Sequence, residues 1–227
     1  MAWSDPVALY CERLVPGLWG EPLNALSNIA FVAAGVAVLR MHSGLRTRGA
    51  HIPADIGALP WLVLAVAGCS FLFHTLATRW AGWLDSLSIL LYCALAVYTF
   101  VAHATSAGRA PAALAALMFA AASIGTSRLL PPDTLNGSAA YLPNLLTLLA
   151  VSTYLRMQQA PAWRGFALAT VVFTVALMLR TLDRAWCSTL PIGTHFLWHL
   201  LTGVLLWLVS KELTLRHFPR HEMNVRA

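Results

Sequence analysis

The chain has 227 residues, of which 59% are hydrophobic and only 11% are charged. Its mean hydropathy is +0.68, and soluble domains carry about 25% charged residues, so an ordinary water-soluble globular protein is excluded. The formal net charge is +6, but the basic residues fall in short segments between long apolar runs. That pattern is typical of membrane topology and not of a phosphate-binding surface, so no nucleic-acid partner is expected.

The apolar residues lie in seven runs, each close to the ~20 residues that cross a bilayer as a helix. We therefore predict an all-α polytopic membrane protein, a bundle of seven transmembrane helices that forms one domain over residues 1–227. A short segment, residues 1–20, precedes the first span without a cleaved signal, and a basic tail, residues 211–227, follows the last. The expected spans are 22–40, 59–76, 82–103, 110–129, 139–154, 163–180 and 193–210.

The distribution of Lys and Arg predicts how the bundle is oriented. With the N-terminus outside, ten basic residues fall on the inner side and five on the outer side, which favours N-out and C-in by the positive-inside rule. The inner residues are Arg40, Arg46, Arg48, Arg109, Arg156, Arg164, Lys211, Arg216, Arg220 and Arg226. The outer residues are Arg13, Arg79, Arg128, Arg180 and Arg184.

Several spans carry ionisable or strongly polar residues, each of which costs ~2.5–3.5 kcal/mol to insert and therefore indicates a function. In the N-out orientation, spans one, three and seven begin at the outer side and span two ends there. The costly side chains then share one depth, which predicts a site in the extracytoplasmic half of the bilayer. These residues are Glu21, Asn24, Ser70, His74, Asp85, His195 and His199. Asn28 lies seven residues after Glu21 and shares its helical face.

Three of these residues form a candidate metal site. His195 and His199 are one helical turn apart, and His74 comes from another span. Three neutral imidazoles suit tetrahedral zinc with a fourth position for water, whose pKa zinc lowers to ~7. Asp85 would then accept the proton of that water and deliver it to a leaving amine, and Ser70 would donate a hydrogen bond to the developing oxyanion.

Taken singly, these residues have simpler interpretations. His, Ser and Asn in membrane helices commonly form interhelical hydrogen bonds, and Asp85 alone suits an interfacial position beside Arg79. Axial ligation of a membrane haem is a further alternative, although His195 and His199 lie only one turn apart. The remaining histidines fall near helix ends or in loops and are expected to be solvated; they are His42, His51, His103, His217 and His221.

With these motifs assembled, the sequence resembles the alkaline ceramidase family, within a wider group of seven-span membrane hydrolases that includes the progestin and adiponectin receptor-like proteins. The residues that carry the resemblance span nearly the whole chain: Cys11, Glu12, Glu21, Asn24, Asn28, Ser70, His74, Asp85, His195 and His199. The resemblance implies that the three histidines bind zinc, that Ser70 and Asp85 assist, and that a ceramide amide is hydrolysed to a sphingoid base and a fatty acid. A membrane lipid is the expected partner, and no protein partner is predicted. The receptor-like relatives leave a non-catalytic lipid receptor with a structural metal as the alternative.

Calcium-regulated members of that family carry acidic and amide ligands before the first span. Glu12 and Glu21 match these ligands, whereas Leu9 and Leu14 stand where an Asp and an Asn are expected. A hard cation needs six or more oxygen ligands, so the two leucines argue against calcium. If calcium binds, backbone carbonyls and water must replace the missing ligands.

The four cysteines divide into two pairs. Cys69 and Cys93 fall inside expected spans, whereas Cys11 and Cys187 lie outside the hydrocarbon on the outer side. An oxidising exterior allows the latter two to form a disulfide. The resemblance implies this pairing, because the ceramidases join an early cysteine to the loop before the last span.

Overall fold

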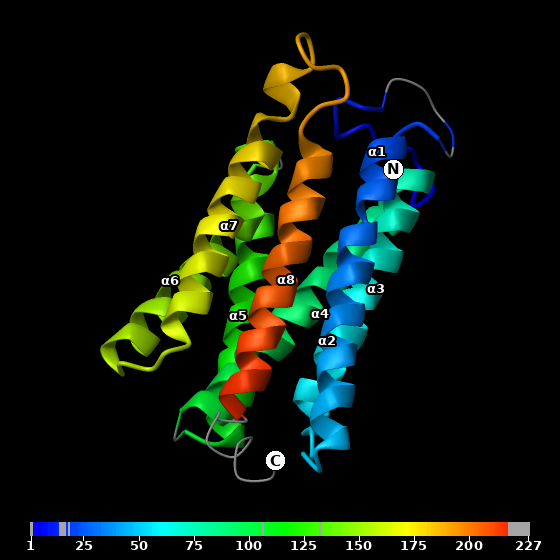
Figure 1. Ribbon diagram of the computed structural model, residues 1–227. Helices are drawn as coiled ribbons and strands as arrows, with labels where there is room; N and C mark the ends of the chain where they lie inside the picture. The colour runs from blue at the N-terminus through cyan, green and yellow to red at the C-terminus, as the bar shows by residue number, and fades with distance from the viewer. Residues whose placement is uncertain (1, 14–16, 18, 106, 132, 218–227) are drawn as a thin grey trace.

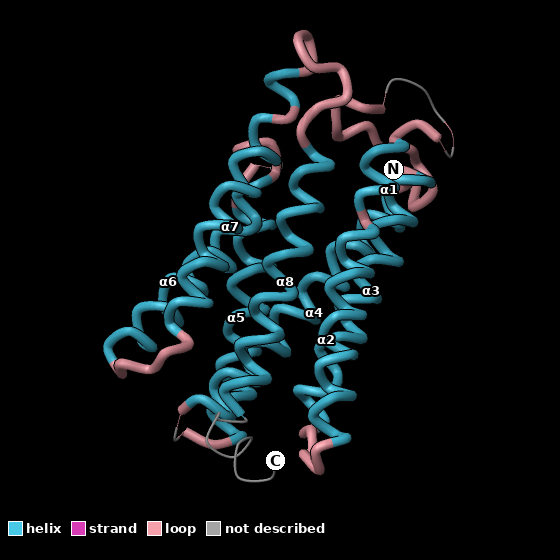
Figure 2. Tube along the Cα trace, in the orientation of Figure 1, coloured by secondary structure: helices cyan, strands magenta, loops and turns pink. Residues whose placement is uncertain are grey.

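The computed structural model describes residues 2–13, 17, 19–105, 107–131 and 133–217, which form a helical bundle with no strand among them (Figures 1 and 2). Seven of the helices in this described part are long and apolar enough to cross a membrane. The predicted all-α, seven-span fold is therefore confirmed. The N-out orientation stays a prediction.

The first span consists of two helices, α1 (Pro22–Ser27) and α2 (Ile29–Thr47), which meet at Asn28. Pro22 stands in the first turn, where its missing N–H removes no helical hydrogen bond. The other elements, in chain order, are α3 (Ala54–Leu76), α4 (Arg79–Ala104), α5 (Arg109–Leu129), η1 (Ser138–Tyr141), α6 (Leu142–Met157), α7 (Trp163–Leu182), η2 (Arg184–Trp186) and α8 (His195–His217).

Three helices extend well beyond the spans predicted from hydropathy, and one of them is α8, which was expected to end at residue 210 and continues to His217. The first predicted span stops at residue 40, whereas α2 continues to Thr47, and the second was expected from residue 59, whereas α3 begins at Ala54. All three extensions carry polar residues and lie at the same end of the bundle. Hydropathy marks the stretch that fits the hydrocarbon, and a helix continues past it wherever water or neighbouring helices accept its polar groups.

Helix α8 lies between α2 and α7 and also contacts α3 and α4 (Figure 1). Its close approach to α2 depends on Gly203, because a Cβ added there would lie 2.8 Å from the Cβ of Ala30. Small residues permit such close helix packing in membranes. The central position of α8 matters because this helix carries two of the three candidate ligands.

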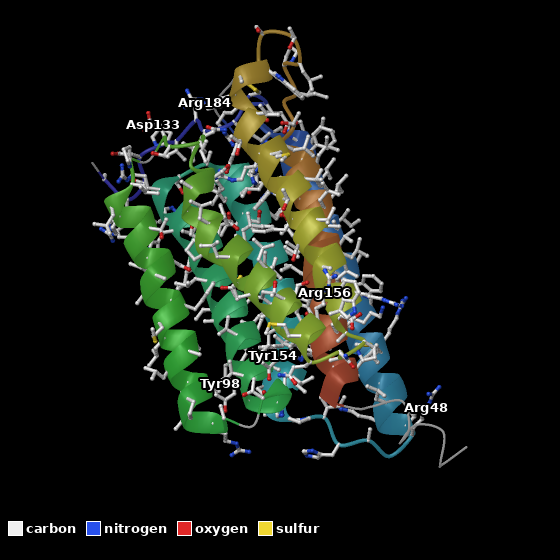
Figure 3. All side chains as sticks on the ribbon, turned by 90° about the vertical axis from the view of Figure 1, so that its left-hand side faces the viewer. Arg48, Tyr98, Asp133, Tyr154, Arg156 and Arg184 are labelled. Carbon is white, nitrogen blue, oxygen red and sulfur yellow. A yellow bond between two sulfur atoms is a disulfide. The ribbon has the colours of Figure 1, made fainter. Side chains whose placement is uncertain are left out.

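The two ends of the bundle differ in content. Asp133 and Arg184 lie at one end, and Arg48 and Tyr98 lie at the other (Figure 3). The end with Arg184 holds the starts of α1 and α8 and the end of α3, and is called here the site end (Figure 1). Parts of the predicted N-terminal segment (1–20) and of the basic tail (211–227) lie outside the described residues. Leu14, Arg220, His221 and Arg226 are among these parts, and the side chains of Arg216 and His217 are not described.

The N-terminal segment, residues 2–13, is tied to two other parts of the site end. The N–H of Val7 donates to the carbonyl of Ala77 at 2.8 Å, and an isolated β-bridge joins Pro6 to Thr78. A disulfide joins Cys11 to Cys187 in the loop before α8. The predicted pairing is thus confirmed, and the two cysteines expected within spans are free.

The prediction of solvated histidines is wrong for His42. This side chain is 2% exposed, and its Nε2 lies 3.0 Å from the hydroxyl of Thr214. It is buried because α2 continues past the predicted end of its span and packs on α8. His51 is exposed as expected, and His103 is half-buried with its Nε2 2.7 Å from Asp55.

Candidate metal centre

The three histidines predicted as ligands meet at the site end of the bundle. His74 comes from the last turn of α3, and His195 and His199 come from the first turns of α8. Their available ring nitrogens all lie within 4.8 Å of one another, and each residue is at most 2% exposed. The ring centroids are 4.6–5.2 Å apart. Three buried imidazoles at this spacing suit a single metal ion.

The surrounding residues determine which nitrogen two of these rings present. His74 Nδ1 lies 2.6 Å from Glu21 Oε2. His199 Nδ1 lies 2.7 Å from Ser27 Oγ and 3.0 Å from the carbonyl oxygen of Asn24. With Nδ1 engaged in both rings, Nε2 is the nitrogen that remains to bind a metal. Ser27 was not among the predicted site residues, since its contact depends on a helix far along the chain.

His195 is held by different contacts. Asp183 Oδ1 accepts hydrogen bonds from the backbone N–H groups of Thr194 at 2.6 Å and of His195 at 3.0 Å, at the start of α8. The Tyr10 ring stacks on His195 with centroids 3.6 Å apart. Nδ1 of His195 is buried and has no hydrogen-bond partner among the residues that the structure describes. An unpaired buried ring nitrogen beside two other imidazoles is one mark of an ion-binding position.

Glu21 connects the first ligand to a basic residue of the N-terminal segment. Its Oε1 lies 2.5 Å from Arg13 Nε, and its Oε2 accepts from Asn24 Nδ2 at 3.1 Å. Burial alone would raise the pKa of Glu21, but the hydrogen bonds from His74, Arg13 and Asn24 outweigh burial and lower it. Arg13 also donates to the backbone carbonyl of His74 at 2.9 Å, near the end of α3.

Glu12, the other predicted acidic ligand for calcium, instead caps α1. Its two carboxylate oxygens accept from the N–H groups of Leu23 at 2.6 Å and Asn24 at 2.8 Å. Burial raises the pKa of Glu12, opposed by these two hydrogen bonds. All four carboxylate oxygens of Glu12 and Glu21 are therefore engaged by groups of the chain. Calcium here would have to compete with an arginine and a helix N-terminus, and Leu9 supplies no side-chain oxygen.

The two asparagines predicted to support the site act at different places. Asn24 supports the histidine cluster through two hydrogen bonds. Its side-chain amide donates to Glu21, and its backbone carbonyl pairs with Nδ1 of His199. Asn28 Nδ2 donates to the carbonyls of Asn24 at 2.9 Å and Ala25 at 3.1 Å, within its own span. Asn28 therefore braces the junction of α1 and α2 and has no described hydrogen bond to the histidines.

Ser70 and Asp85 line the same cavity as His195 and His199. Ser70 is 2% exposed, and its side chain lies within hydrogen-bonding reach of Asp85. Oδ1 of Asp85 is buried, and no described residue forms a hydrogen bond with it. The structure thus brings together polar residues that the sequence placed at one depth on separate spans.

The cavity extends from the histidines into the interior of the bundle. Its charged lining residues lie beside the histidines, where Ser70, Tyr10 and Tyr141 join Asp85 and Arg180. Further polar groups in the wall come from Tyr92, Asn144, Thr147 and Thr202. The rest of the wall is mainly apolar and includes Ile89, Phe100, Phe119, Val151, Phe166 and Leu206. A pocket with one polar end and a long apolar remainder fits an amphiphilic ligand.

Arg180 was expected as a charge at the outer end of its span, and the structure places it in the last turn of α7 but with its side chain buried. The residue is 9% exposed, and its Nη1 donates to the carbonyl of Asn136 at 2.7 Å and the hydroxyl of Ser138 at 3.0 Å. Its guanidinium lies 5.1 Å from the ring centroid of Tyr141. The loop before α6 therefore encloses a cation that hydropathy assigns to the surface.

A family model described as Ceramidase matches residues 10–221 of the chain. The chain belongs to the ceramidase family. None of the curated proteins compared with the chain matches it. The ceramidase match includes the disulfide and all three histidines, in agreement with the resemblance carried by the sequence motifs. Membership of the ceramidase family indicates a hydrolase acting on a lipid amide, and the histidine cluster is compatible with a metal site.

Proposed function

We propose that the chain is a zinc-dependent intramembrane hydrolase that cleaves the amide bond of ceramide, or of a related lipid amide, to a sphingoid base or other amine and a fatty acid. The observation that carries the proposal is the convergence of three buried histidines with Asp85 and Ser70 at the polar end of an apolar cavity. The ceramidase match supports the same reaction class.

The donor set fits zinc in a catalytic role. Three imidazoles lie within 4.8 Å of one another, and the cluster found among the described residues contains no fourth protein ligand. Structural zinc sites are normally closed by four protein ligands, whereas catalytic sites keep one position open. When bound, zinc would supply Lewis-acid polarisation of the amide carbonyl and lower the pKa of water at the site.

Asp85 acts as the general base in this proposal. Its buried Oδ1 has no hydrogen-bond partner among the described residues, and Asp85 lines the cavity beside the histidines. Asp85 takes a proton from the attacking water and delivers it to the amide nitrogen as the C–N bond breaks. The water oxygen becomes the second carboxylate oxygen of the fatty acid, and Ser70 donates a hydrogen bond to the oxygen on which negative charge develops.

The cavity accounts for the lipid half of the substrate. Its apolar wall accepts hydrocarbon chains, while the amide lies at the polar end beside the histidines. With the predicted N-out orientation, this end belongs to the extracytoplasmic half of the bilayer. The substrate would then reach the site from the membrane.

The direct test is hydrolysis by detergent-purified protein. Ceramide with a labelled acyl chain is incubated with untreated, chelator-treated and zinc-restored protein, and released fatty acid is measured by mass spectrometry. We expect release that chelation abolishes and zinc restores. If folded, zinc-loaded protein hydrolyses neither ceramide nor related lipid amides, the proposal fails and a receptor with a structural metal becomes the better account.

A further inference from the structure

Arg180 is a buried cation with hydrogen-bonding capacity left over. Asn136 and Ser138 account for its Nη1, but its Nε is buried and has no hydrogen-bond partner in the part of the chain that the structure describes. No ion pair found among the described residues includes it. A guanidinium carries five N–H donors, and its burial without a paired anion is costly. These contacts orient the group and leave its Nε–H available to an acceptor on a ligand.

The position of Arg180 indicates where such an anion would lie. A second cavity opens at the site end beneath the N-terminal segment, with Trp3 and Trp83 in its wall. This cavity and the inner one share four lining residues, Tyr10, Asp85, Tyr141 and Arg180. These four residues are called here the neck. A ligand that extends from the inner cavity toward the site end lies against the guanidinium.

Tyr10 fixes how the neck relates to the histidines. Its ring stacks on His195, and it lines both cavities together with Arg180. The guanidinium is therefore one side chain removed from the histidine cluster. It is suited to a group a few bonds from the scissile carbonyl, on the amine half of the substrate.

We propose that Arg180 is a specificity residue that binds a carboxylate on the amine half of the substrate, so that N-acyl amino acids are preferred over neutral lipid amides. This inference rests on the proposed hydrolase function. The planar guanidinium matches a planar carboxylate in two parallel hydrogen bonds. A phosphate dianion would leave one negative charge unpaired close to Asp85, which favours the monovalent carboxylate.

Hydrolysis of an N-acyl amino acid follows the same steps as the proposed hydrolysis of a lipid amide. The acyl chain occupies the apolar cavity, the amide lies beside the histidines, and the carboxylate occupies the neck. Water forms the new C–O bond, the C–N bond breaks, and Asp85 transfers the proton to the departing nitrogen. The products are a fatty acid and an amino acid, and no other reactant is needed.

The kinetic test compares two substrates that differ only in charge, N-oleoylglycine and N-oleoylglycinamide, through the oleate that each releases. We expect wild-type kcat/KM to be about 10- to 100-fold higher for the acid, the range of charge-assisted hydrogen bonds. Arg180→Gln should remove this preference by lowering kcat/KM for the acid much more than for the amide. Arg184→Gln, which changes an exposed arginine in η2, is the matched control and should keep the preference.

A binding measurement separates this inference from the hydrolase proposal. The ligands are a 4-oxo fatty acid, in which methylene replaces the amide nitrogen of the N-acylglycine, and its primary amide. Tighter binding of the acid to wild type, lost in Arg180→Gln, supports a carboxylate site even if no amide is cleaved. Equal binding of acid and amide to wild type overturns the inference even if ceramide is hydrolysed. If Arg180→Gln does not fold, the comparison of acid and amide binding to wild type is enough to decide the inference.

Discussion

His74 Nδ1 and Glu21 Oε2 lie 2.6 Å apart, so a carboxylate at the start of α1 orients the ligand supplied by α3. Glu21→Gln weakens this hydrogen bond and leaves Arg13 without its counter-charge. We expect zinc affinity to fall about 10- to 100-fold, as for other outer-shell carboxylates, in a chelator competition on purified protein. Asp133→Asn, in an exposed loop, serves as the control. Unchanged zinc affinity in Glu21→Gln would exclude this role.

Asp85→Asn removes the proposed base without removing a candidate ligand. The variant should keep its zinc and lose about 10²- to 10⁴-fold in turnover, the usual contribution of a general acid–base. Zinc content and fatty-acid release are measured on the same preparation. Full activity in this variant means that another group accepts the proton.

Asp183 joins three segments at the site end, because its oxygens accept from the N–H groups of Cys11, Thr194 and His195. Asp183→Asn replaces one acceptor oxygen by a donor and removes the charge. We expect a loss of about 1–3 kcal/mol in stability and a lower Tm, followed with a thiol-reactive dye on the free cysteines within the spans. A Tm equal to that of Asp133→Asn would show that these hydrogen bonds add nothing measurable.

The disulfide between Cys11 and Cys187 closes a loop across 176 positions of sequence. Its removal by Cys11→Ser should cost about 2–4 kcal/mol and loosen Tyr10, which stacks on a candidate ligand. Peptide mapping with and without reductant should find the linked pair in wild type and in a Cys69→Ser control. Free Cys11 in wild-type protein prepared without reductant would refute the pairing under those conditions.

Hydropathy predicted the number and order of the spans because every helix that crosses a bilayer needs a long apolar stretch. It could not predict where α2 ends or where α3 begins, since residues such as His42 continue a helix beyond the hydrocarbon. His42 is then buried by Thr214, a contact 172 positions away in sequence. Such burial follows from how helices pack, which composition does not encode.

The histidines could be predicted because metal ligands are costly in a membrane and therefore stand out. Residues that position them do not stand out in the same way. Ser27 is a common membrane residue, Asp183 lies in a loop, and Tyr10 precedes the first span. Arg180 at a span end looks like an ordinary topogenic charge until the loop before α6 is seen to enclose it.

The central claim is that His74, His195 and His199 hold a metal ion. Metal content of detergent-purified protein by mass spectrometry tests it most directly, with His195→Ala/His199→Ala beside wild type and exposed His51→Ala as the control. The account predicts about one zinc per chain in wild type and in the control, and none in the double variant. Absence of zinc from folded wild-type protein never exposed to chelator would contradict this claim. The three histidines would then serve only in packing and hydrogen bonding between helices.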